Sequence, residues 1–289
     1  MFDSPLRYPG GKAKIASLVQ SVFEENDLIG GCYVEPYAGG ASVGLSLLYN
    51  GFVSKIIIND YDRSIYAFWY AVIHDTDNLC RLIRDTSVNM STWKKQQAVQ
   101  KQKETAGLLD LAFSTFFLNR TNRSGIIKAG VIGGNDQSGN YKMDARFNKA
   151  ELINRIQKVS FFSEGIELYN LDAIRLITQV TSELPQRTLI YFDPPYYVKG
   201  KDLYVNYYKH GDHFLVSQMI RGIREHKWIV SYDNNPEIKK LYRGNKQFTY
   251  SLKYSAVNAT SGTEVIIHNT DLYIPHAARP PLTPLPSLA

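Results

Sequence analysis

The segment YFDPPYYVKG, residues 191–200, combines one carboxylate, two prolines and several aromatic rings directly after an apolar run. The apolar run predicts a β-strand. Because proline lacks the backbone N–H that a strand ladder needs, Pro194 and Pro195 should end this strand directly after Asp193. The sequence therefore predicts a stiff strand exit at which a carboxylate, Asp193, and an aromatic ring, Tyr196, lie side by side.

A glycine pair follows the first apolar segment of the chain, in VEPYAGG. Gly39 and Gly40 stand between a strand pattern and a helical pattern, where free backbone N–H groups can meet a ligand closely. Glu35 ends the strand pattern and adds a carboxylate at the same edge. The turn matches neither G-x-G-x-x-G nor G-x-x-x-x-G-K-[ST], so a phosphate-binding loop is not indicated. A glycine pair can also serve steric needs alone.

Asp60 follows the apolar run KIIIN, about 20 residues after the glycine turn, where the acid of nucleoside-binding βαβ units accepts hydrogen bonds from ribose hydroxyls. The alternative is a helix N-cap, a role that Asp62 can fill equally well. A second glycine turn, RYPGGKAK, offers the flat face of Tyr8 and the cation of Lys12 to a carboxylate-bearing ligand, or forms only a hairpin or cap. Together these residues predict a nucleoside-type cofactor without a dinucleotide phosphate site.

A sheet must position these residues, and the hydrophobic pattern predicts one. Strand and helix patterns alternate over residues 32–73, which is typical of a parallel, doubly wound α/β sheet. The alternation breaks over residues 74–150, which are polar and contain one strongly amphipathic helix, LLDLAFSTFFLNR. It resumes with VSFFSE (residues 159–164), NLDAIRLI, TLIYFD and KWIVSYD. Two antiparallel strands, QFTYSLKYSA and TEVIIHN, are expected last.

We therefore predict one α/β domain formed by residues 1–73 and 151–274, with residues 74–150 as a mainly helical insert. Residues 197–213 are rich in Tyr, Lys and Gly and are expected to form a mobile flap. Residues 275–289 include RPPLTPLP and are expected to be a disordered or loosely packed arm.

The composition, 44% hydrophobic and 21% charged over 289 residues, is ordinary for a soluble globular protein. No stretch approaches about 18 uninterrupted apolar residues, so a membrane span is not expected, and the first residues lack the apolar core of a signal peptide. Cys32 and Cys80 give no disulfide framework and suit a reducing cytoplasm. The six histidines are scattered without a cysteine at ligand spacing, so no metal is expected.

The net charge of +6 is unevenly distributed. Residues 81–158 contain 14 Lys or Arg against 6 Asp or Glu, a surplus larger than that of the whole chain. A basic block in an otherwise nearly neutral protein indicates a polyanionic partner, with nucleic acid first and an anionic membrane second. The alternative is a solvated helical face.

The order RYPGGK, VEPYAGG, IND, a basic insert and DPPY resembles the Dam-like DNA adenine-N6 methyltransferases, in which a recognition insert separates the cofactor and catalytic motifs. The resemblance spans roughly residues 6–268. It implies a Rossmann-like methyltransferase sheet, S-adenosylmethionine as cofactor, double-stranded DNA as substrate, and methyl transfer to the N6 amine of a flipped-out adenine.

The resemblance assigns roles residue by residue. Cofactor contacts fall on Tyr8, Lys12, Gly39, Gly40, Asp60 and Asp193, to which the strand-end position adds Glu35. The catalytic tetrapeptide is Asp193, Pro194, Pro195 and Tyr196. In the insert, FFLNRTNRSG matches the family, and the expected DNA contacts are Arg120, Arg123, Ser124, Ile126 and Lys128.

The chemistry of an exocyclic amine explains the strand exit. Its lone pair is delocalised into the ring, so a carboxylate, Asp193, and the carbonyl of Pro194 would accept its two N–H bonds and favour a nitrogen with more sp³ character. These bonds strengthen as positive charge grows on the nitrogen, which stabilises the transition state selectively. Tyr196 would stack on the base and aim its nitrogen. A target inside a duplex must first leave the stack, at a cost of a few kcal/mol.

Departures from the family leave the recognition sequence open. Members that recognise GATC carry aromatic and arginine residues where this chain has Arg123 and Lys128, and GNYKMDARFN replaces their FNVPFG-like segment. Arg123 could instead cap the preceding helix. Cytosine-N4 transfer, for which Ser would be expected in place of Asp193, and a DNA-binding module without catalysis are the alternatives. A glutamine-modifying enzyme would have Asn there. Whether a restriction endonuclease accompanies the protein is also open.

Overall fold

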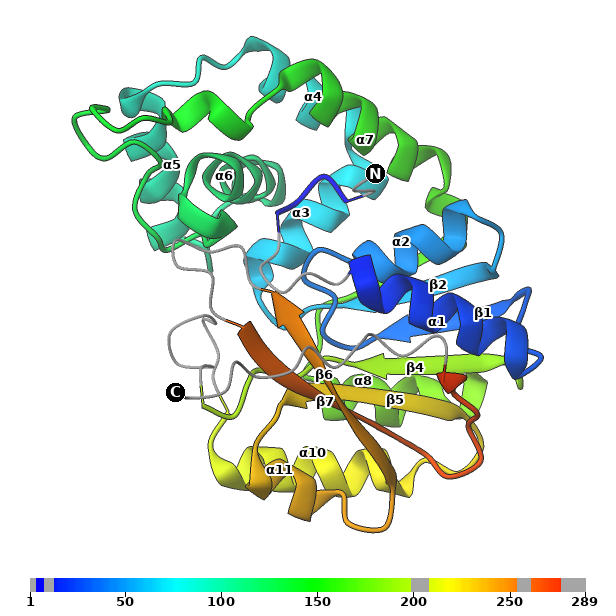
Figure 1. Ribbon diagram of the computed structural model, residues 1–289. Coiled ribbons are helices and arrows are strands. Elements are labelled where there is room, and N and C mark those ends of the chain that lie inside the picture. Colours follow the sequence, from blue (N-terminus) through cyan, green and yellow to red (C-terminus); the bar gives the residue numbers. More distant parts are fainter. Residues whose placement is uncertain (1–3, 8–12, 199–207, 254–260, 277–289) are drawn as a thin grey trace, which may run out of the picture.

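The computed structural model describes residues 4–7, 13–198, 208–253 and 261–276, which form a seven-stranded sheet with helices on both faces (Figure 1). The strands, in the order in which they lie side by side, are β3 (Ile166–Tyr169), β2 (Val53–Asn59), β1 (Gly31–Glu35), β4 (Thr188–Phe192), β5 (Lys227–Asp233), β7 (Ser261–His268) and β6 (Lys246–Lys253). The first five pair in parallel, whereas β7 and β6 are antiparallel, as the sequence predicts for the last two strands.

The central strands are buried on both faces, which explains their uninterrupted apolar runs. In β4, Leu189 and Tyr191 face one core while Ile190 and Phe192 face the other. The first core includes side chains of α1 (Ala13–Glu25), α2 (Ser42–Tyr49) and α3 (Arg63–His74), and the second those of α8 (Ala173–Val180), α10 (His210–Gly222) and α11 (Pro236–Leu241). The predicted doubly wound α/β fold is confirmed.

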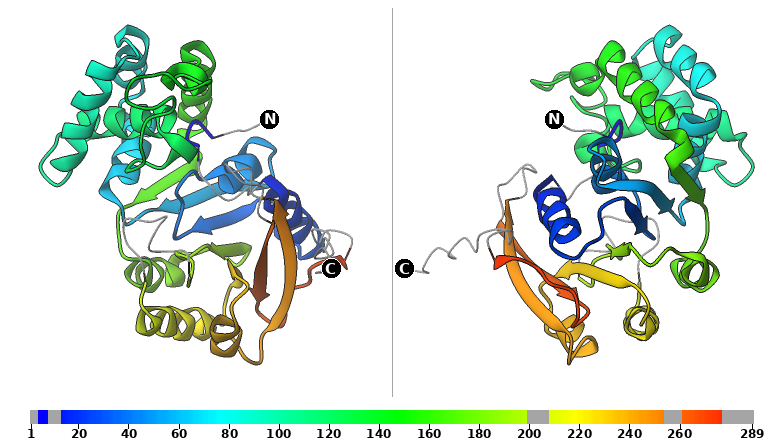
Figure 2. Two further views of the ribbon diagram at one scale, coloured as in Figure 1. Left: turned by 60° about the vertical axis from the view of Figure 1, so that its left-hand side comes forward. Right: turned by 90° about the vertical axis from the view of Figure 1, so that its right-hand side faces the viewer.

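A group of helices gathers beyond one end of the sheet in every view (Figure 2). It contains α4 (Thr76–Asp85), α5 (Met90–Lys101), α6 (Leu108–Thr121) and α7 (Lys149–Phe161). Of these, α4, α6 and α7 pack against α3, and α5 packs against α6. Residues 111–121 of α6 are all buried, because α3, α4 and α5 surround this helix. The prediction that α6 is amphipathic is therefore wrong. Its polar side chains are satisfied internally; Ser114 Oγ, for example, donates to the Gln96 carbonyl at 2.7 Å.

Residues 159–164 do not form the predicted strand. The chain up to Phe161 completes α7, and a short 3₁₀ turn, Ser163–Gly165, leads into β3. Ile156 and Val159 are fully buried three residues apart, so the helical period continues into the aromatic residues that suggested a strand. Further 3₁₀ turns occupy Arg123–Gly125, Met143–Arg146 and Thr181–Glu183.

Part of the predicted flap, residues 199–207, and the end of the predicted arm, residues 277–289, lie outside the described residues. Among the helices that are described, none has the length and apolar character needed to cross a membrane. In the same part of the chain, no cluster of three or more His, Cys, Asp or Glu side chains could bind a metal ion.

Candidate active site

The carboxyl ends of β1 and β4 lie side by side at the topological switch point of the sheet. The strands on one side are reached from β1 and those on the other side from β4. Doubly wound sheets bind their ligands at this place. Glu35 ends β1 and Asp193 follows β4, so two predicted carboxylates stand here. Glu35 is buried and accepts a hydrogen bond from the Tyr33 hydroxyl at 3.0 Å.

The glycine turn after β1 is fixed from two sides. The Gly39 N–H donates to Asp60 Oδ2 at 3.0 Å, and the Trp69 indole N–H donates to the Gly39 carbonyl at 2.9 Å. Gly39 has a φ of 46°, in the left-handed region that favours glycine, and Ala41 has the same φ directly before α2. Gly40 is buried between them. The shape of this turn is therefore set by β2 and α3.

Asp60 lies directly after β2 and is half-buried. Its Oδ2 accepts the N–H of Gly39, and its Oδ1 accepts the N–H of Asp62 at 2.9 Å. Burial, reinforced by the charge of Asp62, raises the pKa of Asp60 to about 7, against the opposing effects of the two backbone donors and Lys103. The carboxyl group therefore changes its charge near neutral pH, and in its ionised form it can accept hydrogen bonds from ribose hydroxyls.

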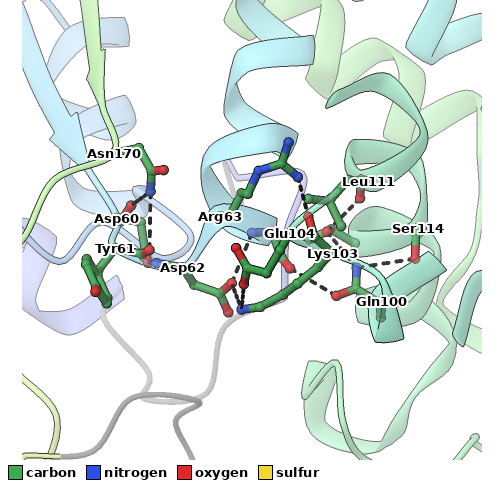
Figure 3. A network of polar contacts seen from close by, with 12 residues as sticks. Asp60, Tyr61, Asp62, Arg63, Gln100, Lys103, Glu104, Leu111, Ser114 and Asn170 are labelled. Carbon is green, nitrogen blue, oxygen red and sulfur yellow. Dashed lines mark hydrogen bonds and ion pairs between the residues drawn. The ribbon is translucent and has the colours of Figure 1, made fainter. Parts of the chain in front are cut away.

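The helix-cap role belongs to Asp62. Its Oδ1 accepts the Ser64 N–H at 3.0 Å at the start of α3, and it pairs with Lys103 Nζ at 2.9 Å (Figure 3). The neighbouring Arg63 donates to the carbonyls of Lys103 and, at 3.0 Å, Ala106. These contacts connect the carboxyl edge of the sheet to the segment between α5 and α6. Asp60 is thereby left available for a ligand role.

Asn59, which the sequence interpretation missed, connects the loops that follow three strands. Its Nδ2 donates to the carbonyls of Pro36 and Leu171, both at 2.9 Å, and its Oδ1 accepts the Leu171 N–H at 2.8 Å. The side chain is almost completely buried at the end of β2. An asparagine at the end of an apolar run was its signal in the sequence.

Asp193 is oriented from β5. Ser231 Oγ donates to Asp193 Oδ1 at 2.8 Å, and the Tyr191 hydroxyl lies 2.8 Å from Ser231 Oγ. Because the serine proton is directed to Asp193, Tyr191 is the donor in the second bond. Pro194 and Pro195 are buried and belong to no strand, so β4 ends where the sequence predicts.

Two more carboxylates fix the segment after the prolines. Asp233 accepts the N–H groups of Tyr197, at 2.8 Å, and Val198, at 3.1 Å. Glu264 of β7 accepts the Tyr196 hydroxyl. Tyr196 is 5% exposed, so most of its surface is enclosed. The strand exit is thus fixed by side chains of β5 and β7.

Tyr8 and Lys12 lie outside the described residues, but Arg7, just before them, is bound to α6. The Arg7 N–H donates to Asn119 Oδ1, and Asn119 Nδ2 donates to the Arg7 carbonyl, each at 2.7 Å. The segment that leads into the predicted cofactor contacts is therefore attached to the helical group.

Arg120, a predicted DNA contact, is buried in the same junction. Its Nε donates to the Pro5 carbonyl at 2.9 Å, and its Nη2 donates to the same oxygen. Burial, together with the charge of Arg155, lowers the pKa of Arg120 to about 9. This guanidinium fixes the N-terminal segment against α6.

The remaining predicted DNA contacts share one loop after α6. Arg123, Ser124 and Lys128 are exposed and Ile126 is half-buried. Asn122 shapes the loop, because its Nδ2 donates to the carbonyls of Ile126 and Ile127 and its Oδ1 accepts the Trp93 indole N–H at 2.7 Å. The loop is therefore built on a buried polar contact.

The structure thus separates the predicted residues into two places. Glu35, Gly39, Gly40, Asp60 and Asp193 share the carboxyl edge of the sheet, whereas the loop of residues 123–128 belongs to the helical group. The residues that the sequence interpretation missed are polar side chains in or beside apolar runs: Asn59, Asn119, Ser231, Asp233 and Glu264.

Residues 8–256 match the sequence profile of the D12 class N6 adenine-specific DNA methyltransferases. The Type II methyltransferase M.MjaIII of Methanocaldococcus jannaschii is 25% identical over 260 residues, which are 83% of this chain and 87% of the relative. Among solved structures, a SAM-dependent methyltransferase from Agrobacterium tumefaciens aligns with a TM-score of 0.42 and 8% identity, over 89% of this chain and 61% of its own. The rRNA methyltransferase AviRa from Streptomyces viridochromogenes aligns with a TM-score of 0.35 and 11% identity, over 87% and 83%.

Proposed function

The chain belongs to the D12 class N6 adenine-specific DNA methyltransferase family, and on that premise we propose which of its residues carry out the reaction. The reaction is methyl transfer to the exocyclic N6 amine of adenine in DNA. One observation carries our assignment: Asp193, oriented by Ser231, stands at the topological switch point beside the carboxyl end of β1.

S-adenosylmethionine is the proposed methyl donor, and when bound it supplies a methyl group on a sulfonium that a nitrogen lone pair can attack. The carboxyl edge offers groups that fit its nucleoside. Asp60 is a half-buried acceptor for ribose hydroxyls, and the turn at Gly39 brings the backbone close without an intervening Cβ. Glu35 adds a second carboxylate. Tyr8 and Lys12 stay predicted contacts.

Asp193 and the Pro194 carbonyl accept the two N–H bonds of the adenine amine in this proposal. Both acceptors stabilise the positive charge that grows on the nitrogen during attack. After transfer the nitrogen carries one proton too many, and the Asp193 carboxylate accepts it. Ser231 keeps that carboxylate oriented through the 2.8 Å bond to Oδ1. Tyr196 stacks on the flipped base.

DNA contacts are assigned to the insert, residues 74–150, and within it to the loop with exposed Arg123 and Lys128. Arg120 contributes indirectly, since its guanidinium donates to the Pro5 carbonyl. The description of the Methanocaldococcus relative as a Type II methyltransferase supports a further proposal, a restriction endonuclease of the same specificity encoded nearby. The buried free thiols Cys32 and Cys80 support the proposed cytoplasmic location.

The test is incorporation of a tritiated methyl group from S-adenosylmethionine into duplex DNA, followed by nucleoside analysis. Wild-type protein should produce N6-methyladenine. Asp193→Ala should lower the rate at least about 100-fold with the thermal midpoint unchanged, because the residue lies at a strand exit outside the core. Asp271→Ala is the matched control: it removes a carboxylate that pairs with Lys227 at the opposite end of β5.

Three other results would correct the proposal. N4-methylcytosine as the product would move the enzyme to the cytosine-specific alternative. Binding of cofactor and DNA without methylation would indicate a DNA-binding module. Wild-type turnover in Asp193→Ala would remove this carboxylate from the chemistry.

A further inference from the structure

Glu264 is a completely buried carboxylate on β7, near the predicted catalytic tetrapeptide and outside it. Its strand neighbours are Asp233 on β5 and Tyr250 on β6. A buried carboxylate is costly unless hydrogen-bond donors compensate its charge. A carboxylate at this fully buried position of β7 therefore calls for a specific explanation.

Two phenols provide the compensation. The Tyr196 hydroxyl donates to Glu264 Oε1 and the Tyr250 hydroxyl donates to Oε2. Burial, together with the charge of Glu264, raises the pKa of Tyr250 well above its usual value, so this phenol stays protonated. Both hydroxyl protons therefore point at Glu264.

This arrangement determines how Tyr196 is oriented. The ring follows two prolines, its hydroxyl is bound to a neighbouring strand, and it is 5% exposed. A tyrosine anchored at its backbone and at its hydroxyl has little freedom to rotate. Phenylalanine would give the same flat surface without the second anchor.

We propose that Glu264 is a positioning residue for methyl transfer: it fixes the plane of the Tyr196 ring before the target base arrives. The inference rests on the proposed stacking of adenine on Tyr196. A base stacked on a fixed ring presents its amine in one direction, and alignment of reacting atoms has a large effect on rate. Glu264 therefore acts on catalysis through Tyr196 without touching the substrate.

Two matched substitutions test the proposal. Tyr196→Phe and Tyr250→Phe each delete one hydroxyl that donates to the same carboxylate, so their effects on folding should be similar. Single-turnover methylation, with cofactor and DNA saturating, should fall about 10-fold in Tyr196→Phe and stay within about 2-fold of wild type in Tyr250→Phe. Equal rates in the two variants would overturn the proposal.

Substitution of the carboxylate adds an independent measurement. Glu264→Ala should lower the rate about 10-fold in the wild-type background and not at all when Tyr196 is already Phe, because both changes release the same ring. Glu264→Gln should recover part of the lost rate, since the amide oxygen still accepts from one phenol. Additive losses would overturn the positioning role. If Glu264→Ala does not fold, the two phenylalanine variants still decide.

Tyr196→Ala separates this inference from the proposed function. If Tyr196→Ala loses rate while the two phenylalanine variants have equal rates, stacking on Tyr196 remains supported. Glu264 is then rejected as the residue that positions the ring. An unchanged rate in Tyr196→Ala would reject the stacking itself. Fluorescence of 2-aminopurine at the target position should show base flipping in Tyr196→Phe as in wild type, because the change affects alignment after flipping.

Discussion

The side-chain amide of Asn119 forms two hydrogen bonds with the backbone of Arg7, one in each direction and each 2.7 Å long. Asn119 Nδ2 also donates to the Gly125 carbonyl at 2.8 Å. Gly125 has a φ of 75°, and a Cβ there would lie 2.6 Å from the Arg7 carbonyl oxygen, so this close packing requires glycine. One buried amide therefore connects the segment before Tyr8 and Lys12 with the loop that carries the predicted DNA contacts.

Asn119→Ala should weaken cofactor and DNA binding together, because it releases both segments at once. It leaves backbone groups of Arg7 and Gly125 without their partner, so the free energy of unfolding should fall by about 1–3 kcal/mol. Calorimetry with S-adenosylhomocysteine and fluorescence anisotropy with duplex DNA measure the two affinities, and chemical denaturation measures the stability.

Asn26→Ala is the matched control for this prediction. Asn26 brackets the backbone of Tyr273 in the same way, accepting its N–H at 2.9 Å and donating to its carbonyl at 2.8 Å, on elements unrelated to the site. The Asn26→Ala variant should have a lower free energy of unfolding, while its affinities for cofactor and DNA stay unchanged. If Asn119→Ala behaved like Asn26→Ala, Asn119 would have a structural role alone.

Local patterns predicted the strand ends and the glycine turn, because proline, glycine and apolar alternation act within a few residues. They could not predict which distant side chains complete the site. Ser231 lies 38 residues after the carboxylate it orients, Glu264 lies 68 after Tyr196, and Asn119 lies 112 after Arg7. The first two pairs arise from the order of the strands and the third from the packing of α6 against the N-terminal segment, and local periodicity determines neither.

The two errors in the fold have the same origin. The mixture of apolar and polar residues in α6 predicts an amphipathic helix, but tertiary packing buries both kinds. The aromatic residues near residue 161 have high strand propensity, yet they end a helix whose other turns are fixed by α3 and α4. In both places, contacts from other helices outweighed the local preference.

Ser231→Ala should lower the methylation rate by about 10-fold, which corresponds to the roughly 1.5 kcal/mol of one hydrogen bond to a charged group. The substitution removes the donor to Asp193 Oδ1 and the hydroxyl that lies 2.8 Å from the Tyr191 hydroxyl. Cofactor and DNA affinities should stay unchanged, so the loss should appear in kcat. Single-turnover kinetics at saturating substrates check this; an effect confined to KM would contradict the orienting role.

Cofactor affinity should rise with pH through neutrality. The pKa of Asp60 is raised to about 7 by burial, so its carboxyl is mostly protonated at pH 6 and mostly ionised at pH 8. Only the ionised form accepts charge-assisted hydrogen bonds from ribose hydroxyls. If only that form binds well, affinity for S-adenosylhomocysteine should be about 10-fold weaker at pH 6 than at pH 8.

Asp60→Asn provides the control for the pH dependence. Asparagine does not titrate, so the variant should bind weakly at both pH values with a flat profile, while DNA affinity stays unchanged. Calorimetry between pH 6 and pH 8 measures both profiles. An equally steep profile in Asp60→Asn would assign the titration to another group.

Arg123 is free to contact DNA in a way that Arg120 is not. Its side chain is exposed, and no hydrogen bond or ion pair joins its guanidinium to another residue within the described part of the chain. The carbonyl of Asn122, at the end of α6, accepts instead from Arg7 Nη1 at 3.2 Å. This geometry does not support the alternative that Arg123 caps the helix. The guanidinium passes over Gly130, where a Cβ would lie 2.8 Å from its Nη2.

The last prediction separates base contacts from phosphate contacts. Arg123→Ala and Lys128→Ala should each reduce the difference in binding free energy between cognate and singly mismatched duplexes by about 1–3 kcal/mol, because a base contact discriminates sequence. Lys94→Ala and Lys95→Ala remove exposed cations of α5 and should weaken binding to all DNA alike. Each should also make the slope of the logarithm of the binding constant against the logarithm of salt concentration shallower by about one unit. Gly130→Ala should displace the Arg123 guanidinium and partly reproduce Arg123→Ala. Methylation rates and binding over a salt series measure these effects. Equal proportional losses on cognate and mismatched DNA for Arg123→Ala and Lys128→Ala would show that sequence is recognised elsewhere in the insert.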